Sequence, residues 1–195
     1  MIWTDEKSFE LYPQENKFKL RLLEGENPED FPKPKVQQGG GKIMFWGAIT
    51  GFGQIFLDEI KGKITSKTYC NFLENKALPV IKRLCSPSAL FQQDNAKSHA
   101  SGETQAFLEK NNVKLLDWPP QSPDINPIEQ VWGWLAHRLN GMRIQNIKEL
   151  RGTVLKLWEE IPKEAILAFI EKIPDKILYI KEHGGEVYSD HKDRE

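Results

Sequence analysis

The spacing of apolar residues changes along this chain of 195 residues, from every second position near the start to every third or fourth position later. Residues 1–12 and 17–23 alternate as strands do, and residues 42–50 form the most apolar strand candidate, which predicts a central strand. Gly51-Phe52-Gly53 predicts a turn into a further strand over residues 54–60. Strands that follow one another through turns favour a three-strand antiparallel meander.

From residue 69 onward the spacing is helical. Residues 69–84 predict a helix that Pro79 kinks or splits. Two short strands, over residues 89–93 and 113–117, flank a helix over residues 101–110, and this β-α-β unit adds parallel strands to the meander. Only helices follow. The predicted fold is therefore an α/β protein with a mixed sheet flanked by helices, which resembles the ribonuclease H-like arrangement.

The composition is that of a soluble, intracellular globular protein. The hydrophobic share is 39%, the charged share is 28% and the formal net charge is −1, so the overall charge does not point to nucleic acid. Two cysteines, Cys70 and Cys85, are too few for a disulfide framework and lack the spacing of a zinc site. Since no apolar run approaches the length of a membrane span, we expect no membrane partner.

The length fits one domain, which we place at residues 1–188. Residues 24–41 change to Pro, Gly, Lys and Gln without a period, which predicts a loop of about 18 residues, long enough to suggest a function. Residues 189–195 are all polar and predict a disordered tail. Met1 leads straight into a strand pattern, so we expect this chain to be the C-terminal part of a longer protein.

Three acidic residues are placed where a metal site can form. Asp5 and Asp94 each end a predicted strand, and Glu129 lies in the first turn of a predicted helix. Ligands collect at the strand ends of open α/β sheets, and magnesium prefers carboxylate oxygens. Two such ions can activate the attacking oxygen and stabilise the leaving oxygen in phosphoryl transfer.

Each of these acids also has a simpler interpretation. Asp5 and Asp94 can be turn residues, because Asp is common where a strand ends. For Glu129, the segment Asn126-Pro127-Ile128-Glu129 has the pattern of a capping box, with Asn at the N-cap and Glu at N3. Spacing alone leaves both roles open, although a glutamate that binds a metal cannot also cap its helix.

Five segments give the chain a resemblance to a known family. They are, in order, W-T-D-E-K-S-F-E-L, F-W-G-A-I-T-G-F-G, F-Q-Q-D-N-A-K-S-H, W-P-P-Q-S-P-D-I-N-P-I-E-Q-V-W and I-K-E-H-G-G-E-V-Y. With these segments the chain resembles the catalytic domain of Tc1/mariner-type transposases, in the Tc1-like branch. The resemblance spans residues 2–188, and the third and fourth segments are the most specific.

The resemblance implies a catalytic triad of two aspartates and one glutamate, with 34 residues between the last two. Residues 95–128 separate Asp94 from Glu129, which gives that number, and the first acid corresponds to Asp5. The triad would bind a divalent metal, Mg²⁺ or Mn²⁺. The implied activity is cleavage and strand transfer in cut-and-paste DNA transposition, with the element ends and a TA target as DNA partners, in the nucleus.

By the same resemblance, residues 24–41 would contain a clamp loop that contacts a partner, which implies a homodimer when the protein is full length. The helix-turn-helix modules that precede the catalytic domain in that family have no counterpart in this sequence. A domesticated or decayed domain that only binds DNA or a protein partner is therefore the main alternative. A ribonuclease that cleaves RNA–DNA hybrids on the same fold is a third hypothesis.

Four further residues lie near the candidate site in the sequence. His99 and Lys97 are candidate substrate contacts, although a histidine at such a position often caps a helix or is satisfied in the core, and an exposed lysine needs no explanation. Asp124, in the segment S-P-D-I-N-P, better suits a turn that sets the start of the next helix. Asp117 ends a strand, but the family pattern gives it no metal role.

Overall fold

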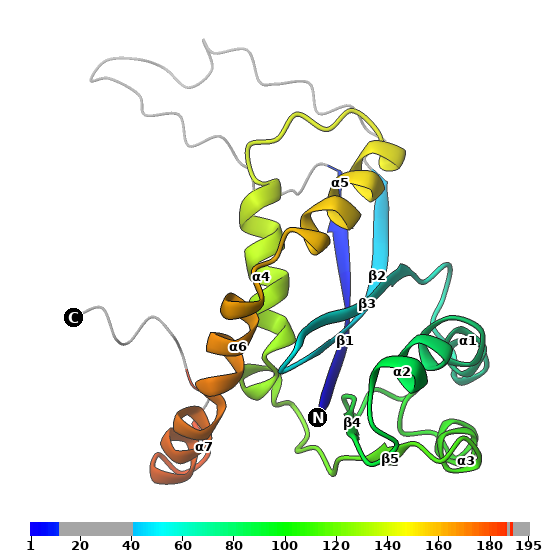
Figure 1. Cartoon of the computed structure of the whole chain (residues 1–195), viewed down its shortest axis with the longest axis vertical. Coiled ribbons are helices and arrows are strands. Elements are labelled where there is room, and N and C mark those ends of the chain that lie inside the picture. Colours follow the sequence, from blue (N-terminus) through cyan, green and yellow to red (C-terminus); the bar gives the residue numbers. More distant parts are fainter. Residues whose placement is uncertain (12–40, 187, 189–195) are drawn as a thin grey trace, which may run out of the picture.

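A computed structural model describes residues 1–11, 41–186 and 188 of this chain (Figure 1). Its centre is a five-stranded sheet with the strand order β3-β2-β1-β4-β5. The strands are β1 (Ile2–Glu10), β2 (Lys42–Thr50), β3 (Gly53–Glu59), β4 (Leu90–Gln92) and β5 (Lys114–Leu115). The predicted loop over residues 24–41, the predicted strand over residues 17–23 and the predicted tail over residues 189–195 fall wholly or almost wholly outside the described residues.

The first three strands form an antiparallel meander, as predicted. β1 pairs with β2, with Asp5 opposite Gly47, and β2 pairs with β3 through a tight turn. Gly53 closes that turn with a φ of 116°, a backbone conformation that side chains with a Cβ disfavour. Since β1 is paired on both sides, it is a central strand, and a side chain in its middle lies at the centre of the sheet.

The remaining two strands are parallel additions, which confirms the predicted β-α-β unit. β4 pairs with β1, placing Trp3 opposite Gln92, and β5 pairs with β4. Between β4 and β5 the chain passes through α3 (Gly102–Lys110), which Ser101 caps by accepting a hydrogen bond from the Thr104 amide. β4 is short, and the chain leaves the sheet two residues before Asp94.

The helix expected over residues 69–84 is divided into three pieces: α1 (Ser66–Phe72), the π-helical turn η2 (Leu73–Ala77) and α2 (Leu78–Leu84). Pro79 lies in the first turn of α2, where its missing N–H costs nothing. The break that Pro79 predicts is therefore present, but it takes the form of a widened helical turn just before the proline.

After β5, the regular elements of the described residues are all helical, as predicted. A short 3₁₀ turn, η3 (Pro123–Ile125), leads into α4 (Ile128–Leu139), and three helices follow: α5 (Ile147–Glu159), α6 (Lys163–Glu171) and α7 (Ile173–Glu182). Within the described residues, no helix is both long and apolar enough to cross a membrane.

Two hydrophobic cores lie on opposite faces of the sheet. Alternate residues of β1 and β2, such as Trp3, Phe9 and Phe45, pack against α4, α5 and α6. The intervening residues, such as Ile2 and Trp46, pack against α1, η2 and α2. Figure 1 shows the two groups of helices on either side of the strands. The predicted α/β architecture, a mixed sheet flanked by helices, is present.

Candidate active site

Asp5 lies in the middle of β1, on the face that α4 covers. The prediction that Asp5 ends a strand is wrong, because pairing with β2 continues β1 to Glu10. The indole Nε1 of Trp132 in α4 donates a hydrogen bond of 2.9 Å to Asp5 Oδ2. This contact depends on Gly47, the neighbour of Asp5 on β2, because a Cβ there would lie 2.5 Å from the Trp132 ring. The absence of a side chain at Gly47 thus allows the indole to approach the strand closely and reach the carboxylate.

The surroundings of Asp5 disfavour its charged form. Burial, together with the negative charges of Glu129 and Glu6, raises the pKa of the Asp5 carboxyl to about 7, although the Trp132 hydrogen bond opposes the shift. The negative charges of two carboxylates from different elements, Asp5 on β1 and Glu129 on α4, therefore interact. Repulsion within the pair disfavours the state in which both carboxylates are charged, and the ammonium group of Lys7, 3.8 Å from Glu129, counteracts it.

Glu129 lies in the first turn of α4 and does not cap it, which excludes the capping-box alternative. Pro127, the N-cap residue of α4, makes no capping hydrogen bond through its side chain, and the Asn126 amide N–H donates to the carbonyl of Pro123 rather than to Glu129. The Asn126 side chain accepts from the Ile128 amide and donates to the Thr4 carbonyl at 3.2 Å, so it ties the start of α4 to β1. The Glu129 carboxylate is left to interact with Asp5 and with Lys7, whose Nζ is 3.8 Å away.

Asp94 lies two residues beyond β4, at the edge where that strand leaves β1. Its Oδ1 accepts a hydrogen bond from the Ala96 amide at 3.0 Å and lies 2.5 Å from His99 Nδ1. The hydrogen bond from His99 lowers the pKa of the Asp94 carboxyl. Asp94 is half exposed, and its side chain contacts the histidine rather than Asp5 or Glu129.

His99 is buried, with each ring nitrogen facing a carboxylate. Nδ1 faces Asp94, and Nε2 lies 3.3 Å from Glu6 Oε1. Burial alone would lower the pKa of His99, but the close contacts with the carboxylates of Asp94 and Glu6 outweigh it and raise the pKa to about 9. The imidazole is therefore cationic at neutral pH, and both of its N–H groups are directed at carboxylates.

The other sequence candidates lie on the surface around the site. Lys97 and Asp117 are exposed. Asp124 lies in the 3₁₀ turn before α4, but its carboxylate accepts a hydrogen bond of 3.2 Å from the distant Tyr188 amide, and its carbonyl accepts one from Lys176. The substrate contacts of Lys97 and His99 stay predictions.

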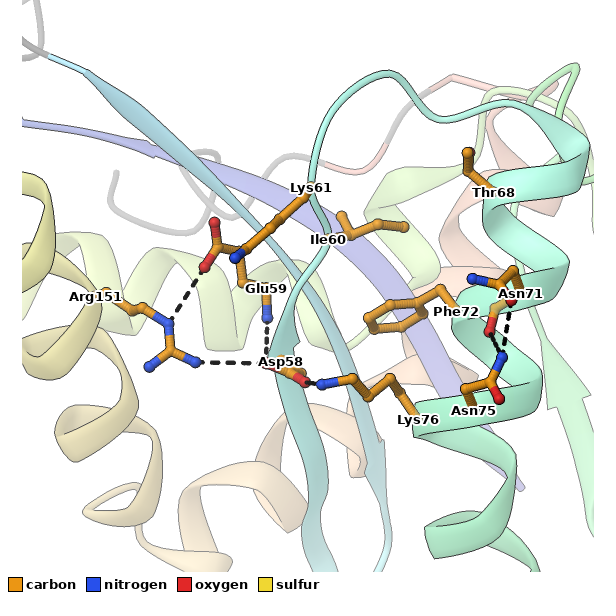
Figure 2. Close-up of a pocket in the computed structure, with 10 residues that line it drawn as sticks. All are labelled: Asp58, Glu59, Ile60, Lys61, Thr68, Asn71, Phe72, Asn75, Lys76 and Arg151. Carbon is orange, nitrogen blue, oxygen red and sulfur yellow. Dashed lines mark hydrogen bonds and ion pairs between the residues drawn. The ribbon is translucent and has the colours of Figure 1, made fainter.

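The structure brings Asp5 and Glu129 together but leaves Asp94 with His99. Within residues 1–11, 41–186 and 188, no three His, Cys, Asp or Glu side chains converge closely enough to hold one metal ion. A cavity of about 610 Å³ lies elsewhere, between β3 and the α1–η2 segment. Figure 2 shows that its charged groups pair among themselves: Arg151 contacts Asp58 and Glu59, and Lys76 contacts Asp58 at 2.8 Å.

The part of the chain that contains the three acidic residues is similar in sequence to known proteins. A sequence profile described as "DDE superfamily endonuclease" matches residues 1–151, the part that contains Asp5, Asp94 and Glu129. The chain belongs to the DDE endonuclease superfamily.

Its relatives confirm the Tc1-like resemblance. The chain is 32% identical over 174 residues to the transposase of the transposable element Tcb1 of Caenorhabditis briggsae, covering 89% of this chain and 64% of that protein. It is 31% identical over 185 residues to the Tc1 transposase of Caenorhabditis elegans, covering 94% and 68%. The chain thus spans about two thirds of the length of these relatives.

Solved structures support the predicted ribonuclease H-like fold. A mariner Mos1 paired-end complex with Mg has a TM-score of 0.82 and 20% identity, over 96% of this chain and 56% of that chain. The isolated catalytic domain of Mos1 transposase matches with a TM-score of 0.67 and 19% identity, over 96% and 83%. At this identity the likeness concerns the fold.

Two residues of the site have no clear signal in the sequence. Glu6 follows Asp5 directly and belongs to the same strand, but its side chain points to the opposite face, toward His99. Trp132 has the spacing of a core residue, and its ring is indeed fully buried, so the hydrogen bond to Asp5 is visible only in three dimensions. Strand alternation could have separated Glu6 from Asp5, but not identified its partner.

Proposed function

We propose that this chain is the catalytic part of a Tc1-type transposase, which cleaves DNA strands and joins them to a new site. Asp5, Asp94 and Glu129 are its catalytic residues and its ligands for a divalent metal, Mg²⁺ or Mn²⁺. The observation that carries the proposal is the pair of carboxylates Asp5 and Glu129: burial, and then the negative charge of Glu129, raises the pKa of Asp5. Two carboxylates arranged in this way favour a cation between them.

The donor set fits a hard divalent ion. All three proposed ligands are carboxylates, and Asp94, at the end of β4 beside β1, keeps a half-exposed side chain. When bound, the metal would supply charge neutralisation and activation of water, and then of a 3′-hydroxyl, for attack on a phosphodiester. The chain itself contributes positioning: Trp132 holds Asp5 Oδ2, and Asn126 fixes the start of α4 against β1, which sets the direction of Glu129.

The partners follow from the relatives. The curated relatives are transposases of transposable elements, and the Mos1 structures include a complex with a left transposon end. These support DNA as the partner of this chain, with the element ends and a TA target as its substrates. A homodimer of the full-length protein and a location in the nucleus complete the proposal.

The test is the replacement of Asp94 by Asn, which removes one carboxylate charge from a half-exposed position. We expect D94N to lose nicking of supercoiled DNA in Mg²⁺ or Mn²⁺ by a factor of at least about 10³, while the fold is retained, because positioned charge carries this chemistry. Asp117→Asn, at an exposed strand end outside the site, is the matched control and should nick normally. Undiminished nicking by D94N would exclude the assignment.

A further inference from the structure

Behind Asp94, on the opposite face of the sheet from Asp5 and Glu129, lies a buried polar cluster that consists of Glu6, Tyr69, Gln93 and His99. His99 is only 3% exposed and contacts both acidic residues, Asp94 through Nδ1 at 2.5 Å and Glu6 through Nε2 at 3.3 Å. The histidine therefore links β1 to the loop that carries Asp94. Neither the superfamily match nor the triad gives His99 or Glu6 a role.

The position of the imidazole is fixed on several sides. The Tyr69 ring lies against it, with ring centroids 4.1 Å apart, and the Tyr69 hydroxyl donates to Gln93 Oε1 at 2.9 Å. Gln93 in turn donates to the carbonyl of His99 at 3.3 Å, and the His99 amide bonds to the carbonyl of Ala96. The last two bonds fix the main chain of His99, and the ring cannot turn from Asp94 without losing its contacts with Asp94, Glu6 and the Tyr69 ring.

Glu6 completes the arrangement. Within the described residues, Glu6 Oε1 and His99 Nε2 have no well-aligned hydrogen bond, so the 3.3 Å contact between them is what compensates each of these buried atoms. Loss of either group would leave the other buried and unpaired, which is costly. Glu6 thus sets the orientation of the ring, and the ring sets the orientation of Asp94.

Only one of the two Asp94 carboxylate oxygens, Oδ1, accepts hydrogen bonds from the protein residues described. In the described part of the chain, the hydrogen bonds to this side chain, from Ala96 and His99, both end on Oδ1. The side chain is nevertheless 53% exposed. One oxygen is held from behind, and the carboxylate still faces solvent where the substrate and metal would arrive.

We propose that His99 and Glu6 are positioning residues for Asp94: His99 holds Oδ1 through Nδ1, Glu6 fixes the ring through Nε2, and Oδ2 is thereby presented to the divalent metal. This inference rests on the proposed function. Partners that orient a ligand from behind typically contribute 10- to 100-fold to metal affinity or activity. A merely structural histidine would contribute to folding stability and leave metal affinity unchanged.

The two ring nitrogens can be tested separately in the 195-residue chain. An asparagine amide reaches about as far as Nδ1, and a glutamine amide reaches about as far as Nε2. His99→Asn keeps a donor for Asp94, whereas His99→Gln keeps one for Glu6. We expect the Mn²⁺ dissociation constant, measured by electron paramagnetic resonance of free Mn²⁺, to rise about 10- to 100-fold in H99Q and clearly less in H99N. Nicking in Mg²⁺ should fall in the same order.

Two further variants make the result decisive. His137→Asn, an exposed histidine on α4, should bind Mn²⁺ like the unmodified chain. Should H99Q fail to fold, Glu6→Gln provides the test, because it preserves the shape of the Glu6 side chain and removes the negative charge that faces His99 Nε2. A raised Mn²⁺ dissociation constant in E6Q supports the inference. A folded H99Q or, in its place, a folded E6Q that binds Mn²⁺ normally overturns it. If the unmodified chain itself neither binds Mn²⁺ nor nicks DNA, the proposed function fails instead.

Discussion

Asp5 is the residue whose protonation should control the stability of the metal-free protein. Its pKa rises from 3.8 to about 7 on folding, so the folded state favours the protonated form. Stability is therefore highest below about pH 4 as far as Asp5 is concerned, and it declines as the pH rises toward 7. The full difference corresponds to at most about 4 kcal/mol.

We accordingly predict that Asp5→Asn raises the free energy of unfolding at pH 8 and changes it little at pH 4. Urea denaturation of both proteins at the two pH values measures this difference. His99, with its pKa raised to about 9, loses its own stabilising contribution between about pH 6.5 and 9, but it does so in both proteins and largely cancels. If Asp5→Asn raised the free energy of unfolding by the same amount at pH 4, removal of a buried charge would not be the cause of the stabilisation.

Gly47 is the second residue with a specific prediction. A Cβ at this position would lie 2.5 Å from Trp132, whose ring is backed by Trp158 at a centroid distance of 5.7 Å and cannot retreat easily. Gly47→Ala should therefore lower the free energy of unfolding by about 1–3 kcal/mol, through overpacking.

The matched control for Gly47→Ala is Gly152→Ala in α5, where a Cβ meets no atom within 4 Å. This change should be neutral or stabilise the protein by up to about 1 kcal/mol, because alanine favours helix. Thermal unfolding followed by circular dichroism compares the two variants. Equal stability of Gly47→Ala and the unmodified chain would contradict the close approach of Trp132 to β2.

Among the elements, α4 depends on the turn that precedes it, and α7 supports that turn. Lys176 of α7 is 5% exposed, donates to the Asp124 carbonyl at 3.1 Å and lies over the Tyr188 ring. Lys176→Met would keep the apolar stem and leave the carbonyl without this donor. We predict a loss of about 1–3 kcal/mol in the free energy of unfolding.

An exposed lysine of the same helix, Lys181, provides the comparison for Lys176. Lys181→Met should change stability by no more than about 0.5 kcal/mol. Chemical denaturation gives both values, and hydrogen exchange at Asn126 and Glu129 reports whether the start of α4 loosens in K176M. If both variants behave alike, α7 does not support the turn through Lys176.

For the whole molecule, metal binding and pH should be linked. Because the proposed ligand Asp5 must be ionised to bind a cation, added Mn²⁺ or Mg²⁺ should raise the melting temperature more at pH 8 than at pH 6. At a metal concentration 100 times the dissociation constant, the stabilisation is about 2.7 kcal/mol. Differential scanning fluorimetry with a metal titration measures it, and Asp5→Asn should reduce it. A melting temperature that metal leaves unchanged at both pH values would favour the domain that only binds DNA or a protein partner.

Local patterns determined most of the elements. The apolar run over residues 42–50 predicted β2, the turn at Gly51-Phe52-Gly53 predicted β3, and helical spacing predicted α3 to α5. Asn126-Pro127 marked the start of α4 to within two residues. These features depend on neighbours in the chain, so a sequence contains them. The helix break near Pro79 was also predictable, but its π-helical form was not, because the packing of α1 and α2 on the sheet determines it.

The candidate site likewise has features that the sequence indicated and features that only the tertiary structure showed. The sequence by itself indicated Asp5, Asp94 and Glu129 through strand ends, helix start and family resemblance, and it left Glu129 with two roles. Only the tertiary structure showed that Glu129 does not cap α4, because the Asn126 side chain bonds to Thr4, 122 positions away, and the Asn126 amide donates to the Pro123 carbonyl. The metal-ligand role of Glu129 stays a prediction. The link from Glu6 through His99 to Asp94 also joins distant segments, and contacts of that kind depend on how the strands and helices pack rather than on any local pattern.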